Sequence, residues 1–239
     1  MMDKLFIVIP AYNEQDNIEE VVKDWYPVVE ARGTDSRLVI IDDGSKDNTY
    51  NKLCELAKDR PQLQPVTKPN GGHGATVLYG YNYALDNGAD FVFQTDSDGQ
   101  TLASEFDNFW GKRNDYDMVI GHRKGRQDGF SRIIVTKTLK AVCFICFGVK
   151  LTDANTPFRL MKAEGLKENL AYVPKDFNLS NVILSVIYAK RGQKVMYIPI
   201  TFRPRQGGVN SINIRKIFKI GAKALKDFSA INKSIKNIK

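Results

Sequence analysis

The sequence predicts an α/β protein with a mostly parallel central sheet and helices on both faces, and three observations lead to this class. Short apolar runs alternate with longer amphipathic segments through the first half of the chain, as strands and helices do in successive βαβ units. The apolar runs are continuous instead of alternating, which is typical of strands buried on both faces of a parallel sheet. A chain of 239 residues with 43% apolar residues is also long enough to bury a sizeable core.

The individual elements follow from the spacing of the apolar residues. Short, mostly apolar segments predict strands at residues 5–9, 38–41, 63–67, 91–95, 118–120 and 194–200. Longer amphipathic or apolar segments predict helices at residues 14–31, 48–59, 73–86, 131–147 and 177–191. The sequence contains no internal repeat and no stretch of linker composition, so we expect one domain with a C-terminal elaboration.

Polar clusters follow three of the predicted strands, at residues 12–14, 42–43 and 96–98. In an open α/β sheet, ligands bind in the crevice outside the carboxyl ends of the strands. Because all three clusters fall at such ends, we expect them to form one ligand site at a single edge of the sheet.

The cluster at the fourth strand contains two carboxylates, Asp96 and Asp98, on either side of Ser97. Residues two apart in an extended chain point to the same side, so both carboxylates could hold one divalent ion. Mg²⁺ prefers few oxygen ligands from the protein and takes the others from phosphate and water. Taken alone, Asp-Ser-Asp-Gly is also a common turn sequence.

Two further segments have both a local and a functional interpretation. Asp42 and Asp43 precede a helix and fit a helix-leading turn, but a carboxylate there could also accept hydrogen bonds from a base or a ribose. The glycine-rich segment 70–75 lacks the Lys-Ser/Thr ending of a P-loop, although its glycines permit close approach of a sugar or phosphate. Within it, His73 fits a helix cap or turn residue as well as it fits a ligand.

Seven short motifs follow one another along the chain: IPAYNE at residues 9–14, DDGS at 42–45, NGGHG at 70–74, DSDGQ at 96–100, GHR at 121–123, TPFRL at 156–160 and RQGG at 205–208. In this order they resemble the motifs of the family 2 glycosyltransferases with the GT-A fold. Within that family, the resemblance is strongest to the dolichyl-phosphate mannose synthase and polyprenyl-phosphate glycosyltransferase branch. Each motif is weak alone, but the seven together span the chain up to about residue 211.

The resemblance implies a role for specific residues and a requirement for Mg²⁺ or Mn²⁺. It implies that Asp96 and Asp98 hold the metal, that Arg123, Arg132 and Arg205 meet phosphate, and that Asp98, Arg205 and Asp176 take part in catalysis. The residues that it places at the nucleotide sugar are Pro10, Ala11, Tyr12, Glu14, Asp43, Gly74, Asp96, Ser97 and Gln100. Guanidinium groups suit the phosphate role because they bind phosphate bidentately and remain charged.

The implied reaction is an inverting, metal-dependent transfer of a sugar from a UDP- or GDP-linked donor to a polyprenyl (dolichyl-type) phosphate. The alternative acceptor is a saccharide hydroxyl, as in surface-polysaccharide biosynthesis. A hydroxyl must lose its proton, so it requires a positioned carboxylate, for which Asp176 is the candidate; the same residue also fits the N-cap of the predicted helix at 177–191. An ionised lipid phosphate needs no base.

Positive charge is concentrated at the C-terminal end of the chain. The sequence has 35 basic and 27 acidic residues, but residues 212–239 contain eight of the basic residues and only one acid. Their apolar residues recur at helical spacing, which predicts a basic amphipathic helix. Such a helix can lie on an anionic membrane surface or pack on its own domain, and we expect no nucleic-acid partner because the segment lacks a stacking pattern.

These features also predict the domain limits and the location of the protein. We expect a glycosyltransferase domain at residues 1–211, with a nucleotide-sugar half up to about residue 100 and an acceptor half beyond it, followed by the helix at 212–239. Three cysteines favour a reducing compartment, and the longest apolar stretch, at 141–149, is too short to span a membrane. We therefore expect a cytoplasmic protein that is peripheral on the inner face of the cell membrane.

Overall fold

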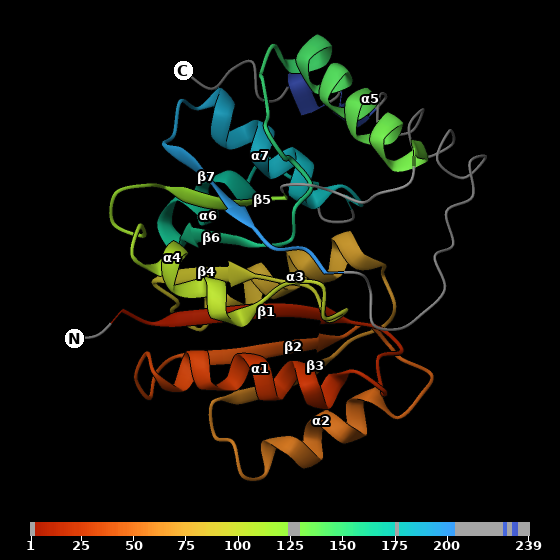
Figure 1. The fold of residues 1–239 in the computed structure, drawn as a ribbon, viewed down its shortest axis with the longest axis vertical. Helices are drawn as coiled ribbons and strands as arrows, with labels where there is room; N and C mark the ends of the chain where they lie inside the picture. Colours follow the sequence, from red (N-terminus) through yellow and green to blue (C-terminus); the bar gives the residue numbers. More distant parts are fainter. Residues whose placement is uncertain (1–2, 124–129, 175–176, 204–226, 229–230, 234–239) are drawn as a thin grey trace.

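The computed structural model describes residues 3–123, 130–174, 177–203, 227–228 and 231–233, and for residues 130–137 it describes the backbone alone. A seven-stranded sheet with the order β3-β2-β1-β4-β6-β5-β7 forms the centre of the molecule (Figure 1). Its strands are β1 (Leu5–Ala11), β2 (Arg37–Asp42), β3 (Leu63–Thr67), β4 (Phe91–Gln94), β5 (Met118–Arg123), β6 (Arg159–Lys162) and β7 (Val195–Ile200).

All five helices that the sequence predicts are present, and two short helices were not predicted. The helices are α1 (Ile18–Glu30), α2 (Thr49–Ala57), α3 (His73–Asp86), α4 (Phe106–Trp110), α5 (Phe130–Phe147), α6 (Ala163–Leu170) and α7 (Ser180–Lys190), with a 3-10 turn at Ala103–Glu105. The prediction of α3 is confirmed to the residue, whereas α4, α6 and β6 were not predicted. All three are short, at five, eight and four residues, which leaves little room for a periodic signal.

The sheet is mostly parallel, as predicted, and β6 is the exception. It pairs antiparallel with β4 on one side and with β5 on the other, while every other pair is parallel. This mixed α/β architecture, with a mostly parallel sheet covered by helices, is the GT-A fold that the motifs imply.

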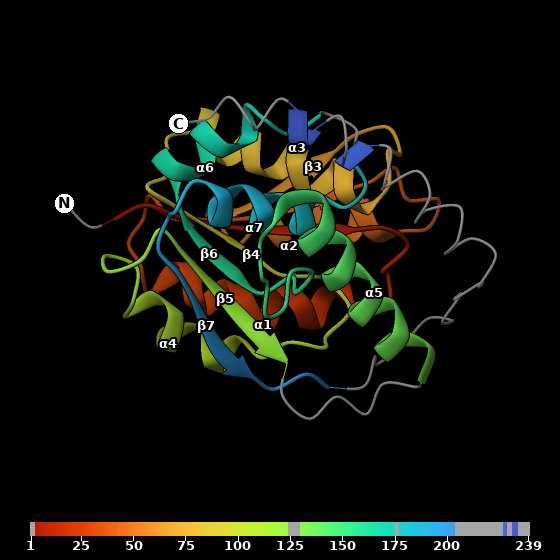
Figure 2. The same cartoon turned by 90° about the horizontal axis from the view of Figure 1, so that it is seen from above.

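The two faces of the sheet have separate apolar cores, and Figure 2 shows from above the helices on either side of the sheet. Along β1, Leu5, Ile7 and Ile9 face the core shared with α1, α2 and α4, whereas Phe6 and Val8 face the core shared with α3, α5, α6 and α7. The strand is therefore buried on both faces, which explains why its sequence is a continuous apolar run.

The described part of the C-terminal segment packs on the domain. Residues 227–228 and 231–233 are helical, and Phe228 and Ile231 are buried in the core on the α5 side. The Phe228 ring lies 5.3 Å from that of Phe147 and 5.9 Å from that of Phe177. Of the two open interpretations of this helix, packing on its own domain holds for these residues. In the part of the chain that the structure describes, we find no helix with the length and apolar character of a membrane span.

Candidate active site

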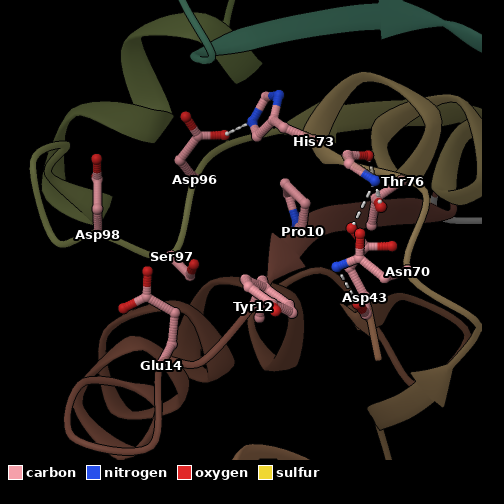
Figure 3. A pocket seen from close by; sticks show the side chains of 12 residues that line it. Pro10, Tyr12, Glu14, Asp43, Asn70, His73, Thr76, Asp96, Ser97 and Asp98 are labelled. Atoms are coloured by element: carbon pink, nitrogen blue, oxygen red, sulfur yellow. Dashed lines mark hydrogen bonds and ion pairs between the residues drawn. The ribbon is translucent and has the colours of Figure 1, made fainter. Parts of the chain in front are cut away.

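A pocket of about 400 Å³ opens at the carboxyl ends of β1, β2 and β4, beside the first turn of α3 (Figure 3). This is the edge at which the sequence predicts a ligand site. The lining residues are Pro10, Ala11, Tyr12, Glu14, Asp43, Asn70, Gly72, His73, Thr76, Asp96, Ser97 and Asp98.

The order of the strands brings these residues together. Because β1 lies between β2 and β4, the three segments that leave these strands are neighbours. The ladders continue past the strand ends: the Asp43 N–H donates to the Ala11 carbonyl oxygen at 2.8 Å, and the Thr95 N–H donates to that of Val8 at 3.2 Å. The sheet thus fixes the backbone that carries Asp43 and Asp96.

Asp43 is held by a set of donors that keep it ionised. Its carboxylate accepts the N–H groups of Gly71 at 2.9 Å and Gly72 at 2.8 Å, and it pairs with the Lys68 ammonium. Burial raises the pKa of Asp43, but these hydrogen bonds outweigh burial, so its pKa lies below the ordinary value. Asp43 therefore presents an anionic hydrogen-bond acceptor at the pocket wall.

Asp42 has a structural role in the same turn. Its buried carboxylate accepts the Thr67 hydroxyl at 2.8 Å and the Ser45 N–H at 3.2 Å. Asp42 is absent from the lining of the pocket. The sequence allowed either a turn or a ligand site at the Asp-Asp pair. In the structure, Asp42 stabilises the turn and Asp43 faces the pocket.

Asp96 and His73 form a polar pair at the opposite wall. The His73 Nε2 lies 2.9 Å from the Asp96 Oδ1, and the side chains are 52% and 25% exposed. The negative charge of Asp96 raises the pKa of His73 above its ordinary value. Figure 3 shows the imidazole reaching from the start of α3 towards the carboxylate.

The loop that carries Asp98 is tied to the segment after β7. The Gln100 N–H donates to the Asp98 Oδ1 at 3.2 Å, and the Gln100 side-chain amide donates to the Arg203 carbonyl oxygen at 2.9 Å. The Arg203 N–H returns a hydrogen bond to the Gln100 carbonyl oxygen at 2.8 Å. Gln100 therefore anchors the loop instead of lining the pocket.

The carboxylates fit a divalent cation only if that ion takes most of its ligands from elsewhere. Asp96 and Asp98 both line the pocket, and hard oxygen donors of this kind suit Mg²⁺ or Mn²⁺. The described residues contain no group of three or more His, Cys, Asp or Glu that could hold a metal by themselves. The protein thus offers an open site that a diphosphate and water would complete.

The remaining wall of the pocket comes from the segment after β1. Tyr12 is 42% exposed there, and an exposed aromatic ring can stack on a nucleobase. Glu14 is buried; it accepts the Asn17 side-chain amide at 2.8 Å, and its own N–H donates to the Thr49 hydroxyl at 2.9 Å. Tyr12 is thus available to a ligand, while Glu14 also fixes the start of α1.

Comparisons with known proteins identify the family of this chain. The family model "Glycosyl transferase family 2" matches residues 6–170. The chain belongs to that family. Glucosyl-3-phosphoglycerate synthase from Mycobacterium tuberculosis, solved with Mn²⁺, UDP and glucosyl-3-phosphoglycerate, has 17% sequence identity and a TM-score of 0.68, over 97% of this chain and 80% of that chain. S. aureus TarS 1–349, solved with UDP-GlcNAc, has 17% identity and a TM-score of 0.63, over 97% and 70% of the two chains.

Two residues that the sequence assigns to ligands in this glycosyltransferase contact other parts of the protein, and their roles at a ligand stay predictions. A Cβ on Gly74 would lie 2.5 Å from the carbonyl oxygens of Phe177 and Asn178, so this glycine permits α3 to pack against residues 177–178. Arg123 pairs bidentately with Asp153 at 2.8 and 2.9 Å, and both side chains are under 10% exposed. The structure thus gives Arg123 a carboxylate where the sequence predicts a phosphate.

Three predicted site residues cannot be placed by their side chains. Asp176 and Arg205 lie outside the described residues, and Arg132 lies in α5 where only the backbone is described. Four pocket residues of the glycosyltransferase were not assigned to the site from the sequence: Asn70, Gly72, His73 and Thr76. Their signal was the glycine-rich motif before α3, which the sequence analysis related to a sugar or phosphate without assigning its members.

Proposed function

We propose that this glycosyltransferase uses a nucleotide-sugar donor, UDP- or GDP-linked, together with Mg²⁺ or Mn²⁺. The observation that carries the proposal is the division of the pocket, with an ionised hydrogen-bond acceptor at Asp43 and two carboxylates at Asp96 and Asp98. The two structural neighbours were solved with UDP or UDP-GlcNAc, and one of them also with Mn²⁺.

In this proposal, the nucleoside occupies the part of the pocket lined by Pro10, Ala11, Tyr12 and Asp43. The Asp43 carboxylate accepts an N–H of the base or a ribose hydroxyl, and the Tyr12 ring stacks on the base. Asp96 and Asp98 hold the cation at the donor diphosphate, with Ser97 between them and Gln100 keeping their loop in place. Glu14 borders the ribose from the wall that it shares with Tyr12.

The proposed reaction is a single displacement that inverts the anomeric carbon. An acceptor oxygen forms a bond to that carbon while the bond to the diphosphate oxygen breaks, and the nucleoside diphosphate leaves with the electron pair. When bound, the cation supplies stabilisation of the negative charge on the departing diphosphate. Asp98 acts by orienting the donor for this displacement, and Arg205 is proposed to meet phosphate charge.

The proposed acceptor is a polyprenyl phosphate, and a saccharide hydroxyl is the alternative. The formal net charge of +8 and the basic segment at 212–239 suit an anionic, membrane-borne substrate. An ionised phosphate attacks without a base and needs cationic ligands, for which Arg132 and Arg205 are the candidates. A saccharide hydroxyl would require a base, and Asp176 is then the candidate.

The proposal includes a division of the chain and a location. Residues up to about 100 bind the donor, residues 101–211 bind the acceptor, and the segment 212–239 contacts an anionic membrane surface. Together these roles suit a cytoplasmic enzyme that is peripheral on the inner face of the cell membrane.

A transfer assay tests the function directly. The full-length protein is incubated with labelled UDP- and GDP-sugars, Mn²⁺ and polyprenyl phosphate, and the label is followed into the organic phase. We expect organic-phase product that EDTA abolishes. The variant Asp96→Asn should lose the product, whereas Asp86→Asn, an exposed aspartate on α3 away from the pocket, should retain it.

The outcomes of these experiments test the acceptor, the metal requirement and the donor class separately. Label in a water-soluble saccharide, with none in the lipid, would favour the hydroxyl acceptor. Transfer that is equal in EDTA and in Mn²⁺ would contradict the metal-dependent mechanism. If calorimetry detected no binding of any sugar nucleotide in the presence of Mn²⁺, the proposed donor class would be wrong.

A further inference from the structure

The C-terminal half of α5 presents an apolar stripe to solvent. Phe144 is 51% exposed and Ile145 is 80% exposed, the highest values among the large apolar side chains that the structure describes. Ala141 and Gly148 are also exposed, and positions 141, 144, 145 and 148 lie on one face of a helix and its immediate continuation. We call these four residues the α5 stripe.

The other face of the same helix is packed on the domain. Cys143 is 1% exposed and Phe147 is 3% exposed, and both belong to the core on this side of the sheet. The orientation of α5 is therefore fixed by packing, and the α5 stripe is the face left over. Figure 1 shows α5 at the margin of the molecule, at the opposite end from α2.

Exposed cations lie next to the α5 stripe. Lys140 and Lys150 are exposed and flank it in sequence. Lys233 is exposed and follows Asn232, whose side-chain amide donates to the Cys146 carbonyl oxygen at 2.6 Å. Residues 130–150 contain four basic residues and no Asp or Glu, so the charge of this segment has a single sign.

The C-terminal segment does not offer its apolar face at the residues that are described. Phe228 and Ile231 are buried against the domain, so they are unavailable to a lipid surface without unpacking. The exposed apolar residues of this region belong to α5 instead. The apolar contact of the region with a membrane would thus come from α5, and the described C-terminal residues would add only their charge.

We propose that the α5 stripe is a docking surface for an anionic lipid bilayer. Phe144 and Ile145 enter the boundary between headgroups and acyl chains, while Lys140, Lys150 and Lys233 face the anionic headgroups. An apolar centre with a cationic rim is the pattern of interfacial helices that bind anionic membranes. This inference deepens the membrane contact of the proposed function and rests on it.

The charge also argues against a second copy of the chain as the occupant. Two copies that met through the α5 stripe would bring their lysines together, and like charges at an interface oppose association. A bilayer with anionic lipid supplies the complementary charge and accepts the apolar side chains at the same time.

The test measures binding of the full-length protein to vesicles without donor or acceptor. Vesicles of phosphatidylcholine alone are compared with vesicles that also contain phosphatidylglycerol, by co-sedimentation. We expect binding that requires phosphatidylglycerol and weakens in high salt. The double variant Phe144→Gln/Ile145→Gln should have an affinity for these vesicles that is lower by a factor of about ten or more, because it loses most of the apolar insertion.

The matched control is Tyr79→Gln, which removes an aromatic side chain that is 41% exposed on α3, outside the stripe. It should bind like the unchanged protein. Thermal unfolding of each variant verifies that the fold is retained, and Lys140→Glu/Lys150→Glu provides a second, charge-based test that should also weaken binding.

Three results would overturn the docking surface. One is unchanged vesicle binding in both double variants; another is equal binding to vesicles with and without phosphatidylglycerol. The third is a dimer in light scattering that Phe144→Gln/Ile145→Gln dissociates, since this would assign the stripe to a second copy. Vesicle binding that persists while the transfer assay gives no lipid-linked product would contradict the proposed acceptor and leave the docking surface standing.

Discussion

The two halves of the sheet reach their final geometry in different ways. On the β1–β4 side, parallel strands alternate with helices, and each turn at a strand end delivers a pocket residue. On the β5–β7 side, β6 is inserted antiparallel between β4 and β5, and the buried Arg159 on it donates to the carbonyl oxygens of Ala154 and Asn181. The strands of the first half therefore follow from successive βαβ units, whereas the position of β6 depends on pairing with strands that lie far from it in the chain.

Arg159 shows the character of the second half. This guanidinium is fully buried on β6 and donates to the carbonyl oxygens of Ala154, Thr156 and Asn181. Burial lowers its pKa. In the first half, the corresponding buried charge is a carboxylate: Asp43 is satisfied by two backbone N–H groups and a lysine.

The largest expected effect lies in the first half. Replacing Asp98 with Asn should reduce transfer by a factor on the order of 10³, because the donor diphosphate loses charge stabilisation in the reaction. The measurement is the initial rate with saturating donor, and urea unfolding should show no comparable loss of stability. Asp86→Asn serves as the control, and activity near that of the unchanged protein would remove Asp98 from the proposed metal site.

The next largest effect is a loss of stability in the second half of the sheet. Arg159→Met should lower the free energy of unfolding by about 3–5 kcal/mol, because three buried carbonyl oxygens lose a charged donor. Urea unfolding measures it, with Arg191→Met as the control: that arginine pairs with Glu168, which is half exposed, and should cost about 1 kcal/mol at most. Equal losses in the two variants would mean that the buried contacts of Arg159 add nothing.

A smaller effect, on the pH dependence of stability, is expected at Asp43 in the first half. The pKa of Asp43 is lowered in the folded state, so its ionised form contributes stability above the ordinary carboxyl pKa of 3.8, and that contribution is lost as the pH falls through the lower folded value. We expect Asp43→Asn to cost about 1–2 kcal/mol near neutral pH and progressively less towards pH 3. Unfolding curves at several pH values measure this, and a cost that does not decline in acid would contradict an ionised Asp43.

The smallest effect concerns His73. Its pKa is raised by Asp96 above the ordinary 6.5, so the pair stabilises the folded state below that pH, and the contribution is lost as the pH rises through the folded value. Because the His73 side chain is half exposed, the contribution of the pair to the free energy of unfolding is about 1 kcal/mol or less. NMR titration should give a midpoint above 6.5 that Asp96→Asn moves down. A midpoint insensitive to that substitution would show that the pair does not form in solution.

The accuracy of the sequence prediction differs in the same way between the halves. The strand at 63–67 and the helix at 73–86 were predicted with their observed limits, because a mostly apolar segment marks the strand and a glycine-rich turn precedes the helix. By contrast, β6 lies inside the TPFRL motif and has only four residues, so no periodicity identified it. Its pairing with β4 and β5 depends on partners more than 30 residues away in sequence.

The candidate site was likewise predicted only where the sequence close to a residue indicates its role. Tyr12, Asp43, Asp96 and Asp98 were predicted together from their positions after buried strands, Pro10 was placed with them by the family resemblance, and all five line one pocket. Gln100 and Gly74 were also assigned to the nucleotide sugar, and in the structure they contact Arg203 and residues 177–178. These partners are over 100 residues away in both cases, and no local pattern identifies them.

The sequence by itself determined the parallel half of the sheet, the edge that carries the pocket and the family to which the chain belongs. The first two depend on apolar runs and on polar residues at strand ends, and the family depends on the resemblance of seven short motifs. All of these are properties of contiguous segments. Only the tertiary structure decided that Arg123 pairs with Asp153, that Asp42 stabilises a turn while Asp43 faces the pocket, and that α5 exposes Phe144 and Ile145. Each of these depends on which distant group occupies the space beside a side chain, and the folded chain alone fixes that.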